Sequence, residues 1–258
     1  MIWRALQQAP KAQVFTDPDF PSVVQQFDFT RLGDGTANIE DNVRGDRVEY
    51  RFEGDAEIAS GALSLDGSGD LIRVATNVSA DLTAAKEKFD FGTGDFTLEV
   101  WLTLDAALSG DPKHVWSSMG LSGNRGTSLT LKAGDKIKFA SSPNGSSVNE
   151  LESSTISLST STDYYFCVCR HNGTARIFYS AMPATTTNVY SAANTDDIQM
   201  SSTDFPLAIG GGWDRSGSRL NGKIEALRVT DAARFTADTG YTPDSLPLYD
   251  PLVDGYGA

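Results

Sequence analysis

The chain has 258 residues, of which 40% are hydrophobic and 21% charged. This is the composition of a folded globular protein and excludes an intrinsically disordered one. Its 21 basic and 34 acidic residues leave a net charge of -13. Such a surface repels phosphate backbones and anionic lipids, so we expect neither nucleic acid nor a membrane as the main partner. The first residues lack the apolar core of a signal peptide, which predicts synthesis in a reducing cytoplasm without export.

Short runs in which apolar and polar residues alternate recur along the chain, with turn residues between them, and they predict about a dozen β-strands. In chain order the expected strands lie in residues 22–29, 47–53, 62–75 (two strands around a turn), 95–104, 114–119, 127–140 (a hairpin), 154–159, 164–180 (a hairpin), 206–212 and 222–230. Residues 230–238 are expected to form one helical turn, with Thr230 or Asp231 as its cap. This order of elements favours an all-β sandwich.

The run at 95–104 has two distinct faces. Phe96, Leu98 and Val100 fall on one side, and Trp101 falls on the other. A strand of a two-sheet sandwich buries one apolar face between the sheets, so we expect Trp101 to lie under a covering loop or on the second face. The stretch is therefore predicted to supply shape rather than chemistry.

Four segments carry a family resemblance. FGTGDFTLEVW (91–101) resembles the central signature of the concanavalin A-like lectin/glucanase superfamily in its laminin G-like branch, and SLDGSGDLIRV (64–74) resembles the strand pair before it. PLAIGGG followed by LNGKIEALRVTDAARFTADTGYTP (220–243) resembles the closing strand of tailed-phage versions, and DPDFPSVVQQFDF (17–29) resembles their opening strand. The resemblance implies a jelly-roll sandwich of two antiparallel sheets and a virion protein of a tailed bacteriophage.

Composition divides the chain into three parts. Residues 1–16 form an N-terminal arm without β alternation, residues 17–248 form the lectin-like domain, and residues 249–258 form an irregular tail. Apolar residues of the arm, namely Ile2, Trp3 and Leu6, are the expected assembly anchor.

The sequence offers few candidate catalytic residues. The laminarinase-type hydrolases of the superfamily place carboxylates in an E-x-D-x-x-E array on one strand, and no such array is present. The pairs Asp95–Glu99 and Glu49–Glu53 are each four residues apart, which separates the carboxyl groups by roughly 13 Å along a strand, more than either glycosidase mechanism uses. We therefore expect no enzymatic activity.

A metal site receives little support. Cys167, Cys169 and His171 alternate along one strand and cannot all converge on one zinc ion, so buried thiols and a turn histidine are expected. Asp66 and Asp70 in the DGSGD turn could hold calcium with a carbonyl oxygen, although turn chemistry alone explains the motif. We therefore expect no bound metal, with calcium at this turn as the alternative.

The loop GGGWDRSGSR (210–219) is the candidate binding site. Trp213 offers a stacking face, and Asp214 and Arg215 offer polar partners, a combination suited to glycans. The competing interpretation is an exposed loop whose tryptophan only covers a sheet edge.

These patterns predict a non-enzymatic virion protein, either a capsid decoration protein or a tail or fibre component. It would contact other virion proteins through its arm and reach the particle from the host cytoplasm. The alternative is a carbohydrate-binding module that attaches the particle to host or environmental glycans. A closed trimer is the expected oligomer, by analogy with the symmetry of such particles.

Overall fold

The computed structural model describes residues 23–36, 38–41, 48–74, 90–119, 126–198, 207–212, 218–246 and 248. These residues form β-strands, one short 3₁₀ turn at Phe29–Arg31 and no α-helix. The strands are β1 (Val23–Asp28), β2 (Asn38–Asp41), β3 (Val48–Glu53), β4 (Glu57–Ala59), β5 (Ala62–Asp66), β6 (Leu71–Val74), β7 (Phe96–Leu104), β8 (Lys113–Ser117), β9 (Thr127–Lys132), β10 (Lys136–Ser141), β11 (Asn149–Glu152), β12 (Asp163–His171), β13 (Thr174–Ala181), β14 (Thr187–Ala193), β15 (Ala208–Ile209) and β16 (Asn221–Thr230). The predicted all-β class is confirmed.

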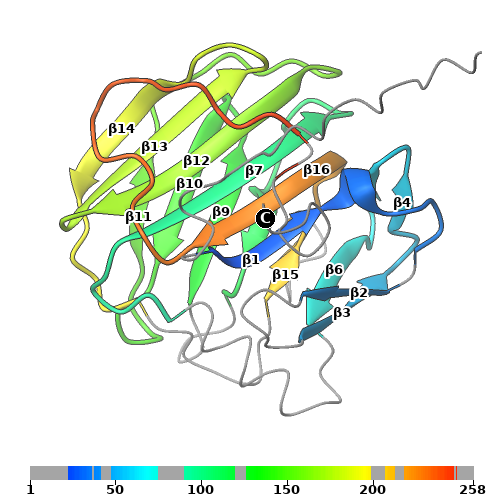
Figure 1. Ribbon diagram of the computed structural model, residues 1–258, viewed down its shortest axis with the longest axis horizontal. Coiled ribbons are helices and arrows are strands. Elements are labelled where there is room, and N and C mark those ends of the chain that lie inside the picture. Colours follow the sequence, from blue (N-terminus) through cyan, green and yellow to red (C-terminus); the bar gives the residue numbers. More distant parts are fainter. Residues whose placement is uncertain are drawn as a thin grey trace, which may run out of the picture.

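The strands form two antiparallel sheets of eight strands each. The first sheet has the order β14-β13-β12-β7-β16-β5-β4, and β1 pairs with β16; the second has the order β11-β10-β9-β8-β15-β6-β3-β2. Figure 1 shows the sheets stacked, with β7, β12 and β16 in front of β9 and β10. Large apolar side chains from both sheets, including Val100, Trp116 and Phe139, are buried in the core. The predicted two-sheet sandwich is confirmed.

Strand β7 is buried along its whole length because both of its faces are covered. Phe96, Leu98 and Val100 belong to the main core, whereas Trp101 belongs to a second apolar cluster with Tyr165. Residues 231–246, which we call the covering segment, supply the outer members of that cluster, and their trace crosses the front of β12 and β13 in Figure 1. The expectation that a loop covers Trp101 is confirmed.

Two predicted hairpins form at the expected turns. Asn172 and Gly173 both have positive φ angles, 49° and 70°, as a tight two-residue turn requires. The β9–β10 hairpin turns at Gly134 and Asp135. The two strands around the DGSGD turn also form, but β5 enters the first sheet and β6 enters the second. That turn therefore carries the chain between the layers.

Other predicted elements are wrong. Residues 154–159 form no strand: the Ser154 amide bonds to Val189 and the Ile156 amide to Asp135, so this segment bridges other elements instead of joining a ladder. Residues 231–238 form no helical turn, because they lie against the outer face of the first sheet. Strand β15 has only two residues, and β2, β4, β11 and β14 were not expected.

The N-terminal arm and the tail lie outside the described residues, so the anchor residues Ile2, Trp3 and Leu6 stay predictions. None of the described residues belongs to a helix that could span a bilayer.

Candidate binding site at one end of the sandwich

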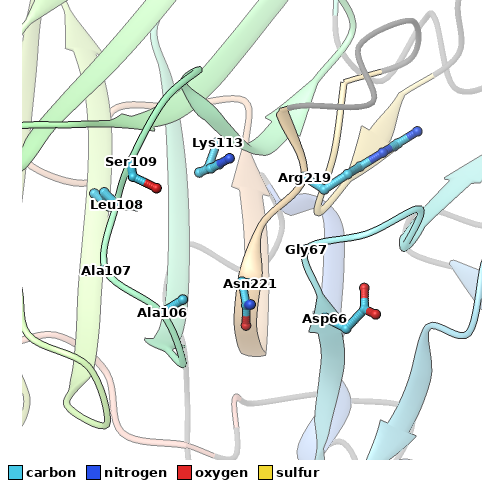
Figure 2. A pocket seen from close by; sticks show the side chains of 9 residues that line it. All are labelled: Asp66, Gly67, Ala106, Ala107, Leu108, Ser109, Lys113, Arg219 and Asn221. Atoms are coloured by element: carbon cyan, nitrogen blue, oxygen red, sulfur yellow. The ribbon is translucent and has the colours of Figure 1, made fainter.

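A small pocket lies at one end of the sandwich, where three connections meet. It has a volume of about 160 Å³. The DGSGD turn contributes Asp66 and Gly67, the β7–β8 connection contributes residues 106–109, and the approach to β16 contributes Arg219 and Asn221. Figure 2 shows these side chains, together with Lys113 at the start of β8. Segments more than 150 residues apart in the sequence thus line one pocket.

Local backbone geometry fixes the walls of the pocket. Gly67 has a φ angle of 83°, and a Cβ atom there would lie 3.0 Å from the Cβ atom of Asn221. The amide of Ser68 donates to Asp66 Oδ1 at 2.6 Å, which closes the turn. The amide of Asp105 donates to the carbonyl of Asn221 at 3.1 Å and holds the β7–β8 connection against β16.

The lining combines polar and apolar groups. Ser109 offers a hydroxyl, Lys113 an amine and Asn221 an amide, whereas residues 106–108 are two alanines and a leucine. The volume is below the roughly 300–1,000 Å³ of pockets for drug-sized ligands. The pocket therefore suits one small polar group, such as a single sugar ring, and its described lining contains no aromatic side chain.

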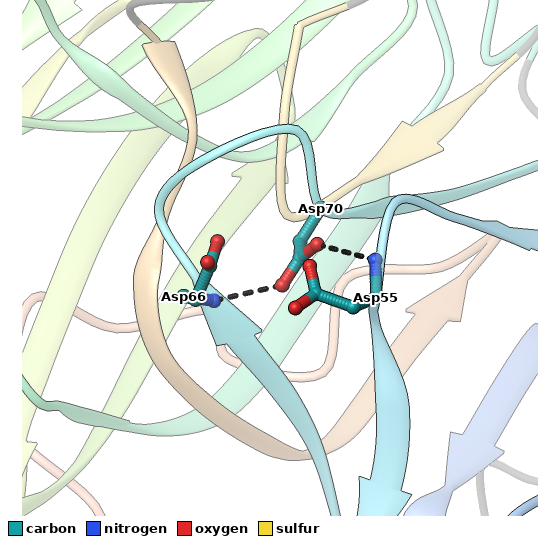
Figure 3. A group of neighbouring side chains, drawn as sticks. All are labelled: Asp55, Asp66 and Asp70. Carbon is teal, nitrogen blue, oxygen red and sulfur yellow. Dashed lines mark hydrogen bonds between the residues drawn. The ribbon is translucent and has the colours of Figure 1, made fainter.

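Three carboxylates gather beside the pocket. Oxygen atoms of Asp55, Asp66 and Asp70 all lie within 4.8 Å of one another, as Figure 3 shows. Oxygen is the ligand atom that calcium prefers, so these residues could hold a divalent cation. The sequence predicted two of them, and the β3–β4 turn adds Asp55.

A structural role accounts for the buried member of this group. Asp70 Oδ1 accepts the Asp55 amide and Oδ2 accepts the Asp66 amide, each at 2.9 Å. Burial raises the pKa of Asp70, and the hydrogen bond from Asp66 opposes that rise. Gly54 belongs to the same arrangement, since a Cβ atom there would lie 2.4 Å from Asp70 Oδ1. Asp70 therefore ties two turns together, and calcium at this position stays a prediction.

The carboxylates considered for glycoside hydrolysis are engaged in structural contacts. Glu99 is buried under the covering segment and accepts hydrogen bonds from Arg228 at 2.7 and 2.9 Å. Asp95 lies at the β12–β13 turn, where it accepts the Asn172 amide at 2.8 Å and contacts His171 at 2.9 Å. These two side chains serve different parts of the fold.

The two cysteines have buried side chains. Cys167 and Cys169 are free and buried, and burial raises the pKa of both thiols. Thiols need ionisation and access to react, so the expectation of buried structural cysteines is confirmed.

The predicted glycan-binding residues Trp213, Asp214 and Arg215 lie outside the described residues. The loop that carries them ends at Arg219, which lines the pocket, and the DGSGD turn lies opposite. One residue of that loop, Arg219, and two residues of the DGSGD turn therefore line the same pocket. Sequence reasoning missed Ser109, Lys113 and Asn221, because no local pattern distinguishes them from other loop residues.

Solved structures resemble this fold at low sequence identity. The binding domain of botulinum neurotoxin serotype D/C gives a TM-score of 0.57 at 13% identity, with 83% of this chain and 50% of that chain covered. A structure from a study of botulinum neurotoxin type C cell entry through two ganglioside molecules gives 0.58 at 13% identity, with 83% and 49% covered. Trypanosoma rangeli sialidase gives 0.51 at 15% identity, with 83% and 31% covered. The chain thus spans half or less of the length of these structures.

Sequence comparison gives the family. No curated protein matches the chain. Residues 75–238, more than half of the sequence, match the family described as the concanavalin A-like lectin/glucanases superfamily. The two antiparallel sheets agree with that match. The chain therefore belongs to the concanavalin A-like lectin/glucanase superfamily.

Proposed function

We propose that this protein is a non-enzymatic recognition module that binds a saccharide in the pocket at the end of its sandwich. The observation that carries this proposal is the pocket itself: Ser109, Lys113 and Asn221 line a space of about 160 Å³ together with a short apolar wall. Ligand sites combine these features, with apolar contact for affinity and a few placed polar groups for orientation.

Two further observations support a binding role. An interaction with two ganglioside molecules is named for one of the structures that share this fold. Glu99, the carboxylate that shares a strand with the family-like signature, is held by Arg228 and is 1% exposed. A general acid must reach its substrate, so this residue is unsuited to glycoside hydrolysis.

A glycan array with matched lysine variants tests the proposal. We expect Lys113→Ala to weaken saccharide binding at least about tenfold, because a hydrogen bond from a charged donor contributes roughly 1.5–3 kcal/mol. Lys136→Ala is the control, since it removes the same side chain at the start of another strand, away from the pocket. Absence of binding by the wild type to every glycan would refute the proposal, and release of reducing sugar would replace it with hydrolysis.

The loop that carries Trp213 has its own test on the same array. Trp213→Ala should weaken binding if this side chain stacks on the bound sugar, because a sugar ring gains affinity from contact with an aromatic face. Binding equal to that of the wild type would leave recognition to the pocket residues alone.

The second candidate function is a structural part of a tailed-phage virion, either in the capsid decoration or in the tail. The similarity of residues 17–29 and 220–243 to phage versions of the fold supports it, and it is compatible with glycan binding. Mass spectrometry of purified particles would locate the chain. We expect deletion of residues 1–16 to abolish incorporation and to leave the sandwich folded; retained incorporation would refute the anchor role of Trp3 and its neighbours.

A further inference from the structure

Two arginines face each other on the second sheet near the proposed site. Arg51 of β3 and Arg73 of β6 are directly paired in the antiparallel ladder, so their side chains leave the same face. Their neighbours Tyr50, Phe52 and Ile72 pack into the core on the other face. Like charges directly opposite each other destabilise a sheet, and the ion pair of Arg73 with Glu53 offsets part of that repulsion.

Arg219 brings a third guanidinium to this region. A Cβ atom on Gly211 would lie 2.3 Å from Arg219 Nη1 and 2.7 Å from Cδ, so the guanidinium rests against the backbone at Gly211. Figure 2 shows the side chain extending away from the β7–β8 connection. Its Nε and Nη1 atoms are shielded from solvent and have no hydrogen-bond acceptor among the described residues.

The acidic neighbours of Arg219 are already engaged. Glu53 and Asp70 attract its charge and Arg73 repels it, while burial is the main reason that the pKa of Arg219 is lowered. Glu53 forms an ion pair with Arg73. Asp70 accepts the amides of two turns with its two oxygen atoms. Arg219 is only partly buried, but two shielded guanidinium nitrogens without an acceptor among the described residues are costly, and an oxyanion is the partner that the planar fork fits.

We propose that the saccharide bound at this end of the sandwich is anionic, and that its carboxylate or sulfate group binds Arg219 beside Arg73 and Arg51. The inference deepens the proposed function and rests on it, because the sugar ring is assigned to the pocket lined by Ser109, Lys113 and Asn221. Arg219 is itself a lining residue of that pocket and therefore connects the two parts of the site. The net charge of -13 repels a polyanion such as nucleic acid. A ligand with one oxyanion is repelled far less and can bind at a local group of arginines.

Titrations with matched sugars test this inference. Glucuronic acid, glucose 6-sulfate and glucose share one ring and differ in the oxyanion, and inorganic sulfate supplies the oxyanion alone. Ligand-observed NMR on the full chain would give the four affinities. We expect both acidic sugars to bind at least tenfold more tightly than glucose, since each charge-assisted hydrogen bond is stronger than a neutral one.

Arginine variants identify the residue responsible. Arg219→Gln should remove the preference for acidic sugars, so that glucuronic acid and glucose 6-sulfate bind the variant no more tightly than glucose does. Arg176→Gln is the control: it makes the same substitution on β13 of the other sheet, where Arg176 pairs with the exposed Asp238. Circular dichroism and thermal melting would establish that both variants are folded.

The outcomes separate the two proposals. Equal binding of acidic and neutral sugars overturns the anionic specificity and supports saccharide binding. An acidic preference that survives in Arg219→Gln overturns the assignment to this arginine. Sulfate bound through Arg219 with no sugar bound refutes the saccharide function and supports the anion site, whereas no binding of any probe refutes both.

Discussion

Thr103 places one hydroxyl group between two carboxylates on the outer face of the first sheet. Its Oγ1 atom lies 2.6 Å from Asp163 Oδ1 and 3.0 Å from Glu225 Oε1. A hydroxyl donates one proton, so it can satisfy only one ionised carboxylate. Burial raises the pKa of Glu225 to about 7, the hydrogen bond from Thr103 opposes the rise, and the charge of Asp163 adds to it. At neutral pH a large share of Glu225 is therefore protonated and can donate to Thr103.

This arrangement predicts a pH dependence of stability. The folded-state pKa of Glu225 lies above the ordinary value of 4.5, so its proton stabilises the fold fully below about pH 4.5 and this contribution is lost as the pH rises through 7. Glu225→Gln mimics the protonated form. We expect the difference in unfolding free energy, variant minus wild type, to increase by up to about 3 kcal/mol between pH 4.5 and 8.

Urea unfolding at both ends of this range measures the difference, and groups common to the two proteins cancel. A constant difference between variant and wild type would show that folding does not change the pKa of Glu225.

At the scale of elements, the covering segment 231–246 is joined to β7, β12 and β16 by charges and rings. Arg228 bonds to Glu99 at 2.7 Å and to Asp244 of the segment at 2.7 Å. Tyr241 stacks on Phe235 with a centroid distance of 3.4 Å. The Coulombic pull of Arg228 lowers the pKa of Glu99 against the effect of burial, which raises it. The segment therefore supplies a second carboxylate to a buried arginine while it covers an apolar face.

Removing an aromatic ring from the segment should expose the thiols beneath it. Tyr241 contacts Phe178 at a centroid distance of 5.2 Å and belongs to the layer over Cys167 and Cys169. We expect Tyr241→Ala to accelerate modification of both thiols by Ellman's reagent at least tenfold under native conditions, because a cavity replaces the ring.

Thr239→Ala is the matched control, since Thr239 is an exposed residue of the same segment. If Tyr241→Ala lowers stability but leaves the rate of thiol modification unchanged, the thiols react only after global unfolding and the segment does not open separately.

At the scale of the whole molecule, strands from near the two ends of the described chain lie side by side in the first sheet. Strand β1 pairs with β16, so that Phe27 lies opposite Leu227. Val23, Val24 and Phe27 are buried by this pairing. Contacts of such long sequence separation slow folding, and we expect the first strand to be required for a stable fold.

Two truncations test that statement. Deleting residues 1–28 removes β1 and should prevent cooperative folding or lower the melting temperature by more than 10 °C, because three buried side chains contribute roughly 1.5–3 kcal/mol each. Deleting residues 1–22 is the control, because it leaves β1 in place. Equal melting temperatures for the two truncations would show that β1 is dispensable.

Much of the fold could be predicted because short-range sequence patterns indicate many of its strands and turns. The alternation at 96–104 indicated a two-faced strand, and Asn172-Gly173 indicated a tight turn, since these features depend only on neighbouring residues. The expectations for 154–159 and 231–238 were wrong because distant partners decide those segments: Ser154 bonds to Val189, and Phe235 packs over Phe178.

The site was predictable only in part for the same reason. The DGSGD turn and the loop ending at Arg219 stood out in the sequence, but Asp55, Lys113 and Asn221 reach them through strand pairing that no local pattern encodes.

The sequence by itself determined an acidic, all-β sandwich, because alternation and turn residues act within a few positions. Only the tertiary structure decided that β5 and β6, four residues apart, enter different sheets. That division places the turn between them at the end of the sandwich, opposite Asn221 and beside Arg219. The physical reason is that a strand's sheet is chosen by its hydrogen-bond partners, here β16 for one and β3 for the other, and those lie far away in the chain.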